Sequence, residues 1–155
     1  MKINYILTAV NENNLYIDFI PIFIKAWESL YKIKIKIILI MNEIPSKFLY
    51  LKDYIILFKP INNLSTIFQS QIIRLLYPAL LNTNEGILIT DIDMIPLNKT
   101  FFTNCLKNID ENNFVNIAHS TNCGSEQYQM CYNIANSSIW KDIFNINTEN
   151  DIIIR

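Results

Sequence analysis

The sequence predicts an α/β fold with a mostly parallel central sheet that is flanked by helices. Short apolar runs rich in isoleucine, typical of buried strands, occupy residues 3–9, 34–41, 54–58 and 86–89. Longer segments in which apolar residues recur every three or four positions, typical of helices, occupy residues 16–31 and 65–77. Strands that alternate with helices favour parallel pairing, with right-handed crossovers over the faces of the sheet.

The helical segments carry boundary signals. Pro21 is compatible with the first helix only near its first turn, because proline has no N–H to donate to the preceding turn. Ser65 is a candidate N-cap of the second helix, and Pro78 ends it. Trp27 and Trp140 lie on apolar stripes, so we expect both in the core. Weaker patterns predict helical segments at 46–51, 100–107 and 137–144, a strand at 114–118 and extended chain at 127–135.

Composition limits the function. At 155 residues the chain is expected to form one domain, spanning 1–155, and its net charge of −1 argues against a nucleic-acid partner. Three cysteines without a Cys-x-x-Cys pair support neither a disulfide framework nor a zinc ribbon, so we expect reduced thiols in a cytoplasmic protein. No apolar stretch reaches the about 18 residues that a transmembrane segment needs. The sequence stops at Arg155 without a helix cap or polar tail, so a truncated C-terminus is expected.

The most informative stretch is residues 86–97, in which a short apolar run leads into Asp91 and Asp93 and Pro96 then stops the strand. In extended chain these two carboxylates project to the same side, about 6–7 Å apart. Burial of two like charges is costly unless a cation lies beside them. Mg²⁺ and Mn²⁺ accept one or two carboxylates and complete their shells with water and phosphate oxygens. The stretch therefore predicts a metal site; the alternative is that Asp91 caps a turn and Asp93 is simply solvated.

The ligand crevice of such sheets lies at the carboxyl ends of the strands. We therefore expect three stretches to border one cleft: the end of the first strand, the two aspartates, and the polar loop 119–124. His119, the only histidine, is a candidate metal ligand or acid/base group. A polar loop residue is the favoured interpretation of this histidine.

A helix with Arg74 at residues 70–78, followed by the Asp-x-Asp strand at 89–97, resembles the order found in nucleotide-sugar-dependent glycosyltransferases of the GT-A fold, including small viral-like and glycogenin-like members. Residues 129–137 resemble the strand that faces the donor sugar in such enzymes. The resemblance spans about residues 65–145, and its specificity lies in the combined order of the pieces.

This resemblance implies a GT-A-like nucleotide-sugar-binding domain in which Mn²⁺ or Mg²⁺ holds the pyrophosphate. Asp91 would contact the ribose or the ion, and Asp93 would ligate the ion. Arg74 would reach the phosphates or the sugar. The ion would neutralise the charge that develops on the departing nucleoside diphosphate.

The same resemblance implies the residues that surround the nucleotide. Thr8 and Ala9 would border the base through backbone groups, and Val10 and Ile92 belong to the same binding set. Asn133 would lie near the sugar hydroxyls, although an asparagine in a strand can equally satisfy neighbouring backbone.

The function implied is transfer of a sugar from a nucleoside diphosphate sugar to a glycan or protein acceptor. Members of the family usually carry a third metal ligand and, in inverting enzymes, a downstream catalytic carboxylate; Glu149 and Asp151 are the acidic candidates near the end, and nothing marks either as a base. A nucleotide-sugar-binding module without turnover is therefore an alternative. An aspartate-nucleophile phosphatase fits less well, because Ile95 stands where that class needs Thr or Val.

Overall fold

The computed structural model describes residues 1–117 and 129–154. Its described strands form one sheet in the order β3-β2-β1-β4-β6-β5. Their bounds are β1 Ile3–Asn11, β2 Lys34–Ile40, β3 Ile55–Phe58, β4 Gly86–Ile89, β5 Val115–Asn116 and β6 Asn133–Ala135. The first four strands pair in parallel, whereas β6 runs antiparallel to both β4 and β5. The predicted class, α/β with a mostly parallel sheet, is confirmed.

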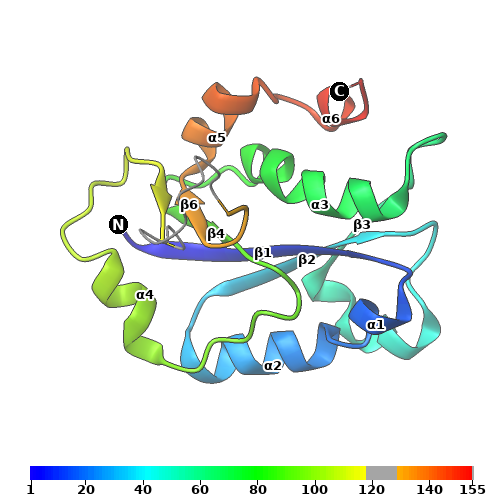
Figure 1. The fold of residues 1–155 in the computed structure, drawn as a ribbon, viewed down its shortest axis with the longest axis horizontal. Coiled ribbons are helices and arrows are strands. Elements are labelled where there is room, and N and C mark those ends of the chain that lie inside the picture. Colours follow the sequence, from blue (N-terminus) through cyan, green and yellow to red (C-terminus); the bar gives the residue numbers. More distant parts are fainter. Residues whose placement is uncertain (118–128, 155) are drawn as a thin grey trace.

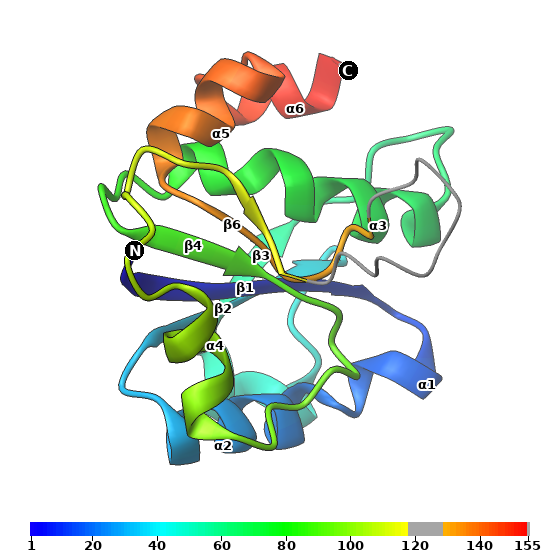
Figure 2. The ribbon, with the colours of Figure 1, turned by 60° about the vertical axis from the view of Figure 1, so that its left-hand side comes forward.

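Helices cover both faces of the sheet (Figure 1). Figure 2 shows α1, α2 and α4 on one face and α3, α5 and α6 on the other. The bounds of the helical segments are α1 Asn14–Ile17, α2 Ile20–Leu30, η1 Ser46–Tyr54, α3 Thr66–Leu76, η2 Tyr77–Leu80, α4 Lys99–Cys105, α5 Ser137–Phe144 and α6 Glu149–Ile154. None of the helices in the described ranges has the length and apolar content that crossing a bilayer requires.

Two apolar cores lie on the opposite faces of the sheet. Successive side chains of β1 alternate between them, so that Ile6 packs with Trp27 on the α2 face and Leu7 packs with Trp140 on the α3 face. Both tryptophans are buried, as the helical stripes predicted. The core strands are buried on both faces, which explains their nearly continuous apolar sequence.

Three predicted elements differ from the structure. The helix predicted at 16–31 is two helices, α1 and α2, and Pro21 lies in the first turn of α2, where its missing N–H removes no hydrogen bond. The strand predicted at 114–118 is only the two-residue β5, and residue 118 lies outside the described part. Within the segment 127–135, only Asn133–Ala135 is a strand, while 127 and 128 are not described.

The first residue of β4 needs to be glycine because two neighbours approach its backbone closely. A Cβ on Gly86 would lie 2.8 Å from the Ile134 side chain and 3.1 Å from the Lys2 carbonyl oxygen. A side chain here would crowd Lys2, just before β1, and Ile134 of β6, and β1 and β6 are the two strands between which β4 pairs.

Candidate functional site

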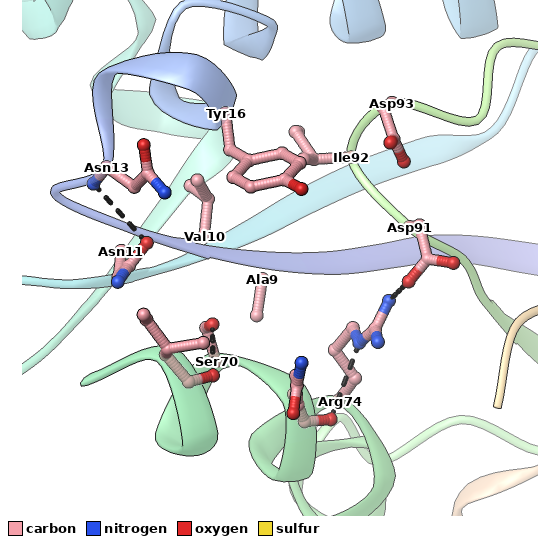
Figure 3. Close-up of a pocket in the computed structure, with 12 residues that line it drawn as sticks. Ala9, Val10, Asn11, Asn13, Tyr16, Ser70, Arg74, Asp91, Ile92 and Asp93 are labelled. Atoms are coloured by element: carbon pink, nitrogen blue, oxygen red, sulfur yellow. Dashed lines mark hydrogen bonds and ion pairs between the residues drawn. The ribbon is translucent and has the colours of Figure 1, made fainter. Parts of the chain in front are cut away.

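A cavity of about 310 Å³ lies at the carboxyl ends of β1 and β4, as the rule for parallel sheets predicts (Figure 3). Its walls come from the end of β1, the loop and helix that follow, one face of α3, and the segment after β4. The lining residues are Ala9, Val10, Asn11, Asn13, Tyr16, Ile67, Ser70, Gln71, Arg74, Asp91, Ile92 and Asp93. Six of the predicted site residues therefore share one cavity.

One face of α3 supplies a wall of the cavity because its lining residues follow the helical repeat. Ile67, Ser70, Gln71 and Arg74 are spaced by three, one and three positions, which places them along the same side of the helix. The opposite side of α3 is buried in the core through residues such as Ile73. The helix is thus anchored by its apolar face and presents polar groups to the cavity.

Arg74 is the buried cation of this site. Only 8% of its side chain is exposed, and its Nη1 donates to the carbonyl oxygen of Thr90 at 3.2 Å. The same nitrogen forms an ion pair with Oδ1 of Asp91, as Figure 3 shows. Burial lowers the pKa of the guanidinium from its ordinary value, while the nearby Asp93 carboxylate raises it. Arg74 therefore places a positive charge, already partnered by an anion, at the cavity wall.

The two aspartates lie at the same end of the cavity (Figure 3). The Asp91 side chain is 40% exposed and Asp93 is exposed, because β4 ends at Ile89 and the chain has already left the sheet. The premise that these carboxylates are buried is therefore wrong, and Asp91 has a cationic partner in Arg74. The metal site itself stays a prediction, since both carboxylates still border one cavity.

The donor set fits a cation that shares its shell with a substrate. Asp91 and Asp93 offer hard oxygen ligands at the mouth of a polar cavity. Within residues 1–117 and 129–154, no group of three His, Cys, Asp or Glu side chains is placed to hold a metal ion. A pair of carboxylates suits Mg²⁺ or Mn²⁺ that keeps waters and binds phosphate oxygens, and it does not suit an all-protein cage. The candidate ligand His119 and the loop 119–124 lie outside the described residues.

Two predicted site residues do not line the cavity. Thr8 is fully buried in β1, one residue before the cavity wall. The side-chain Nδ2 of Asn133 donates to the backbone carbonyl oxygens of Gln129 and Met130, at 3.1 and 2.8 Å. The Asn133 side chain thus hydrogen-bonds to the backbone of the loop that precedes β6. This is the alternative role that the sequence also allowed for an asparagine in a strand.

The loop between β1 and α1 contributes site residues that the sequence did not predict. Asn11 donates from its amide to the Thr66 hydroxyl at 3.2 Å, and that hydroxyl donates to Glu12 at 2.9 Å. The Asn13 side chain accepts from the backbone N–H of Leu15 and so begins α1. These bonds fix the turn against α3. The run of asparagines directly after a buried strand was the available signal, because such residues cap helices and bond to backbone.

Tyr16 is placed by this loop. It lies on α1 and lines the cavity, and Figure 3 shows its ring beside Val10 and Ile92. Tyr16 is 44% exposed, so part of the side chain is accessible to a ligand. An exposed aromatic ring at the wall of a polar cavity is a typical platform for stacking of a flat ring system.

A second cavity, of about 520 Å³, lies beyond the aspartates along the chain. It is lined by residues 95–98, 100–102, 104 and 105, and by Tyr132. Tyr132 adopts a left-handed backbone with φ of 59°, which is rare for a bulky residue. Its N–H donates to the Ile89 carbonyl oxygen at 2.7 Å, so the conformation is held by the end of β4. Burial raises the pKa of the Tyr132 hydroxyl, the charges of Cys131 and Asp93 add to this, and a hydrogen bond with Thr90 opposes it.

The fold is similar to that of a solved glycosyltransferase. The glycosyltransferase GlyE of Streptococcus pneumoniae TIGR4 matches with a TM-score of 0.57 and 17% identity, over 92% of this chain and 36% of that chain. The apo form of GlyE matches with a TM-score of 0.54 and 16% identity, over 99% of this chain and 42% of that chain. The present chain therefore spans less than half the length of the GlyE chains. No protein-family model matches the sequence, and no curated protein matches it.

Proposed function

We propose that this protein is a metal-dependent glycosyltransferase that uses a nucleoside diphosphate sugar as donor. The observation that carries the proposal is the cavity in which Asp91, Asp93 and Arg74 converge at the carboxyl ends of β1 and β4. A cation and two carboxylates at one wall match the needs of a metal-bound diphosphate. The glycosyltransferase-like fold supports the same proposal.

In this proposal each wall of the cavity has a separate task. Asp91 and Asp93 would hold Mn²⁺ or Mg²⁺, and Arg74 would donate to the phosphate oxygens. The aromatic ring of Tyr16 would stack on the base, beside the backbone of Ala9 and Val10. The bound cation would stabilise the negative charge that develops on the leaving diphosphate. The sugar would then lie on the β4 side of the cavity, near the aspartates.

Metal-dependent nucleotide binding tests the proposal directly. Uridine and guanosine diphosphate are titrated into the protein by calorimetry, with and without Mn²⁺, and the titrations are repeated with Asp93→Asn. Asp142→Asn is the matched control, because Asp142 is an exposed aspartate on α5 away from the cavity. We expect Mn²⁺ to strengthen binding in the wild type and in the control, and to have no effect in Asp93→Asn. A nucleoside diphosphate affinity that is the same with and without Mn²⁺ in all three proteins would contradict the proposal.

Turnover separates the enzyme from the alternative of a binding module. The purified protein is incubated with UDP-linked and GDP-linked sugars and Mn²⁺, and release of the nucleoside diphosphate is followed over time. Release above the rate of Asp93→Asn supports a transferase, because many such sites hydrolyse their donor slowly when no acceptor is present. Tight metal-dependent binding without any release would favour a nucleotide-sugar-binding module.

A further inference from the structure

The Asp91 carboxylate already has a cationic partner. Arg74 Nη1 contacts its Oδ1 and also donates to the Thr90 carbonyl oxygen at 3.2 Å, while Nε donates to the Gln71 carbonyl oxygen at 3.5 Å. Asp93, by contrast, is exposed and has no hydrogen-bond partner within the described residues. A divalent ion that binds both carboxylates must therefore share Asp91 with Arg74 or displace it.

Displacing Arg74 is unfavourable unless another anion takes the place of Asp91. The Arg74 side chain is only 8% exposed, and its other hydrogen-bond partners among the described residues are neutral carbonyl oxygens. A buried charge that loses its hydrogen-bonded ionic partner is strongly destabilised, and the nearby Asp93 carboxylate would be taken up by the same ion. The metal alone brings a second positive charge toward this guanidinium and supplies no anion. The ion pair thus opposes loading of the bare metal.

A bound diphosphate can replace Asp91 as the anionic partner of Arg74 and so allow the ion to bind. One phosphate group can accept from Arg74 in a charge-assisted, planar geometry that suits guanidinium groups. The other phosphate group can enter the coordination shell of the ion beside Asp91 and Asp93. A monophosphate has a single phosphoryl group for both tasks, so it releases Asp91 less well.

We infer that Arg74 and the divalent ion are alternative partners of Asp91, and that Arg74 makes loading of the ion depend on a diphosphate. This inference rests on the proposed function and adds to it a binding order and a selection for diphosphate-linked over monophosphate-linked donors. Arg74 is in this role a specificity-determining residue. Without a donor it holds Asp91, and with a diphosphate donor it turns to the phosphate and frees Asp91 for the ion.

The inference is tested by the affinity for Mn²⁺, measured from the paramagnetic resonance signal of the free ion rather than from activity. Titrations use the protein alone and the protein with uridine diphosphate, inorganic pyrophosphate or uridine monophosphate. Asp93→Asn, under the same conditions, corrects for Mn²⁺ that the nucleotides bind in solution. For the wild type we expect weak binding alone and binding about tenfold tighter with either diphosphate, inside the usual range of coupling between two ligands. Uridine monophosphate should give a smaller gain.

Arg74→Gln should bind Mn²⁺ about tenfold more tightly than the wild type in the absence of any phosphate, because Asp91 is then free, and the gain from diphosphate should shrink accordingly. Arg74→Lys keeps the charge and should behave like the wild type toward the bare ion. If Arg74→Gln does not fold, as judged by circular dichroism, the wild-type comparison of diphosphate with monophosphate still decides. Equal gains from both phosphates, or an unchanged Mn²⁺ affinity of folded Arg74→Gln, would overturn the inference.

Different binding results would overturn this inference and the proposed function. If Mn²⁺ and uridine diphosphate bind together in the wild type but not in Asp93→Asn, the proposed function stands, whatever Arg74→Gln does. If no phosphate compound changes the Mn²⁺ affinity of the wild type beyond that of Asp93→Asn, both fail.

Discussion

The side chain of Gln69 pairs with the backbone of Ile61 through two hydrogen bonds, as a neighbouring strand would. Its Oε1 accepts from the Ile61 N–H at 2.9 Å, and its Nε2 donates to the Ile61 carbonyl oxygen at 3.0 Å. Nε2 also donates to the Leu64 carbonyl oxygen at 2.8 Å, and the side chain is only 4% exposed. Gln69 therefore fixes the loop before α3 to the helix whose other side lines the cavity.

Replacing Gln69 by Leu should lower the free energy of unfolding by about 2–4 kcal/mol, because three backbone groups lose a partner in a partly buried place. The matched control is Gln71→Leu, two residues along the same helix and exposed, for which we expect a change within about 0.5 kcal/mol. Urea denaturation followed by circular dichroism measures both. Equal stability of the two variants would show that the Gln69 contacts contribute little.

Trp27 and Trp140 offer a comparison of two buried indoles with different hydrogen bonding. Trp140 Nε1 donates to the Ala135 carbonyl oxygen at 3.1 Å, whereas Trp27 Nε1 is buried without a partner among the described residues. Trp140→Phe should therefore cost about 1–2 kcal/mol more than Trp27→Phe, since only the former breaks a buried hydrogen bond. Chemical denaturation followed by circular dichroism gives both values. A larger loss for Trp27→Phe would contradict this reasoning.

Burial along single elements was predictable from the sequence, because it leaves a local pattern. The alternation and the continuous apolar runs predicted β1 to β4, and the three- and four-residue spacing placed Trp27 and Trp140 in the core. The rule that crevices form at the carboxyl ends of parallel strands then brought Ala9 and Asp91 to one cavity.

Contacts between elements were not predictable in this way. Arg74 and Asp91 are 17 positions apart on different elements, and nothing in either local pattern indicates that they pair. The expected burial of Asp91 was wrong because β4 ends at Ile89, as predicted, and the chain beyond it leaves the carboxylate 40% exposed. The break after α1 was missed because the apolar stripe continues through it, while the hydrogen bonding that starts a new helix at Ile20 does not show in periodicity.

Asparagine takes the left-handed positions that glycine usually occupies. The described residues with positive φ are Asn63, Asn82, Asn108, Tyr132 and Asn145, while the whole sequence holds two glycines. Asn145 has φ of 52° and ψ of 45° directly after α5, and its N–H donates to the Lys141 carbonyl oxygen at 2.6 Å. It therefore closes the helix in the way a C-terminal glycine does.

Replacing Asn145 by Val should reduce the free energy of unfolding by about 1–2 kcal/mol, because a β-branched residue is strained in the left-handed region. Asn145→Gly should leave it unchanged or slightly higher, since glycine adopts this conformation without strain. Thermal denaturation of the two variants and the wild type makes the comparison. A valine variant as stable as the glycine variant would argue against a left-handed Asn145.

The buried hydroxyl of Tyr31 should make the free energy of unfolding fall at alkaline pH. Burial raises the pKa of its hydroxyl above the ordinary value of 10.0, and the hydroxyl donates to the Asn98 carbonyl oxygen at 2.9 Å. The unfolded chain therefore ionises first, so this contribution to stability is complete below pH 10.0 and is lost as the pH rises through the folded pKa. Tyr31→Phe should be less stable than the wild type at pH 8, and the difference should narrow at higher pH. Urea midpoints across this range measure it, and a constant difference would contradict the assignment.

The stacking role proposed for Tyr16 predicts a specific loss of nucleotide binding. Tyr16→Ala should weaken the binding of uridine diphosphate with Mn²⁺ by about 5- to 150-fold, equal to the roughly 1–3 kcal/mol that aromatic stacking contributes per base. Tyr16→Phe keeps the ring and should bind nearly as well as the wild type. Leu15→Ala is the matched control, because Leu15 lies on the same short helix, is 76% exposed and does not line the cavity. Calorimetric titration of the four proteins measures the effect, and inorganic pyrophosphate, which has no base, should bind all of them alike. A Tyr16→Ala variant that loses pyrophosphate binding as strongly as uridine diphosphate binding would place the defect in the phosphate end of the cavity instead of the base end.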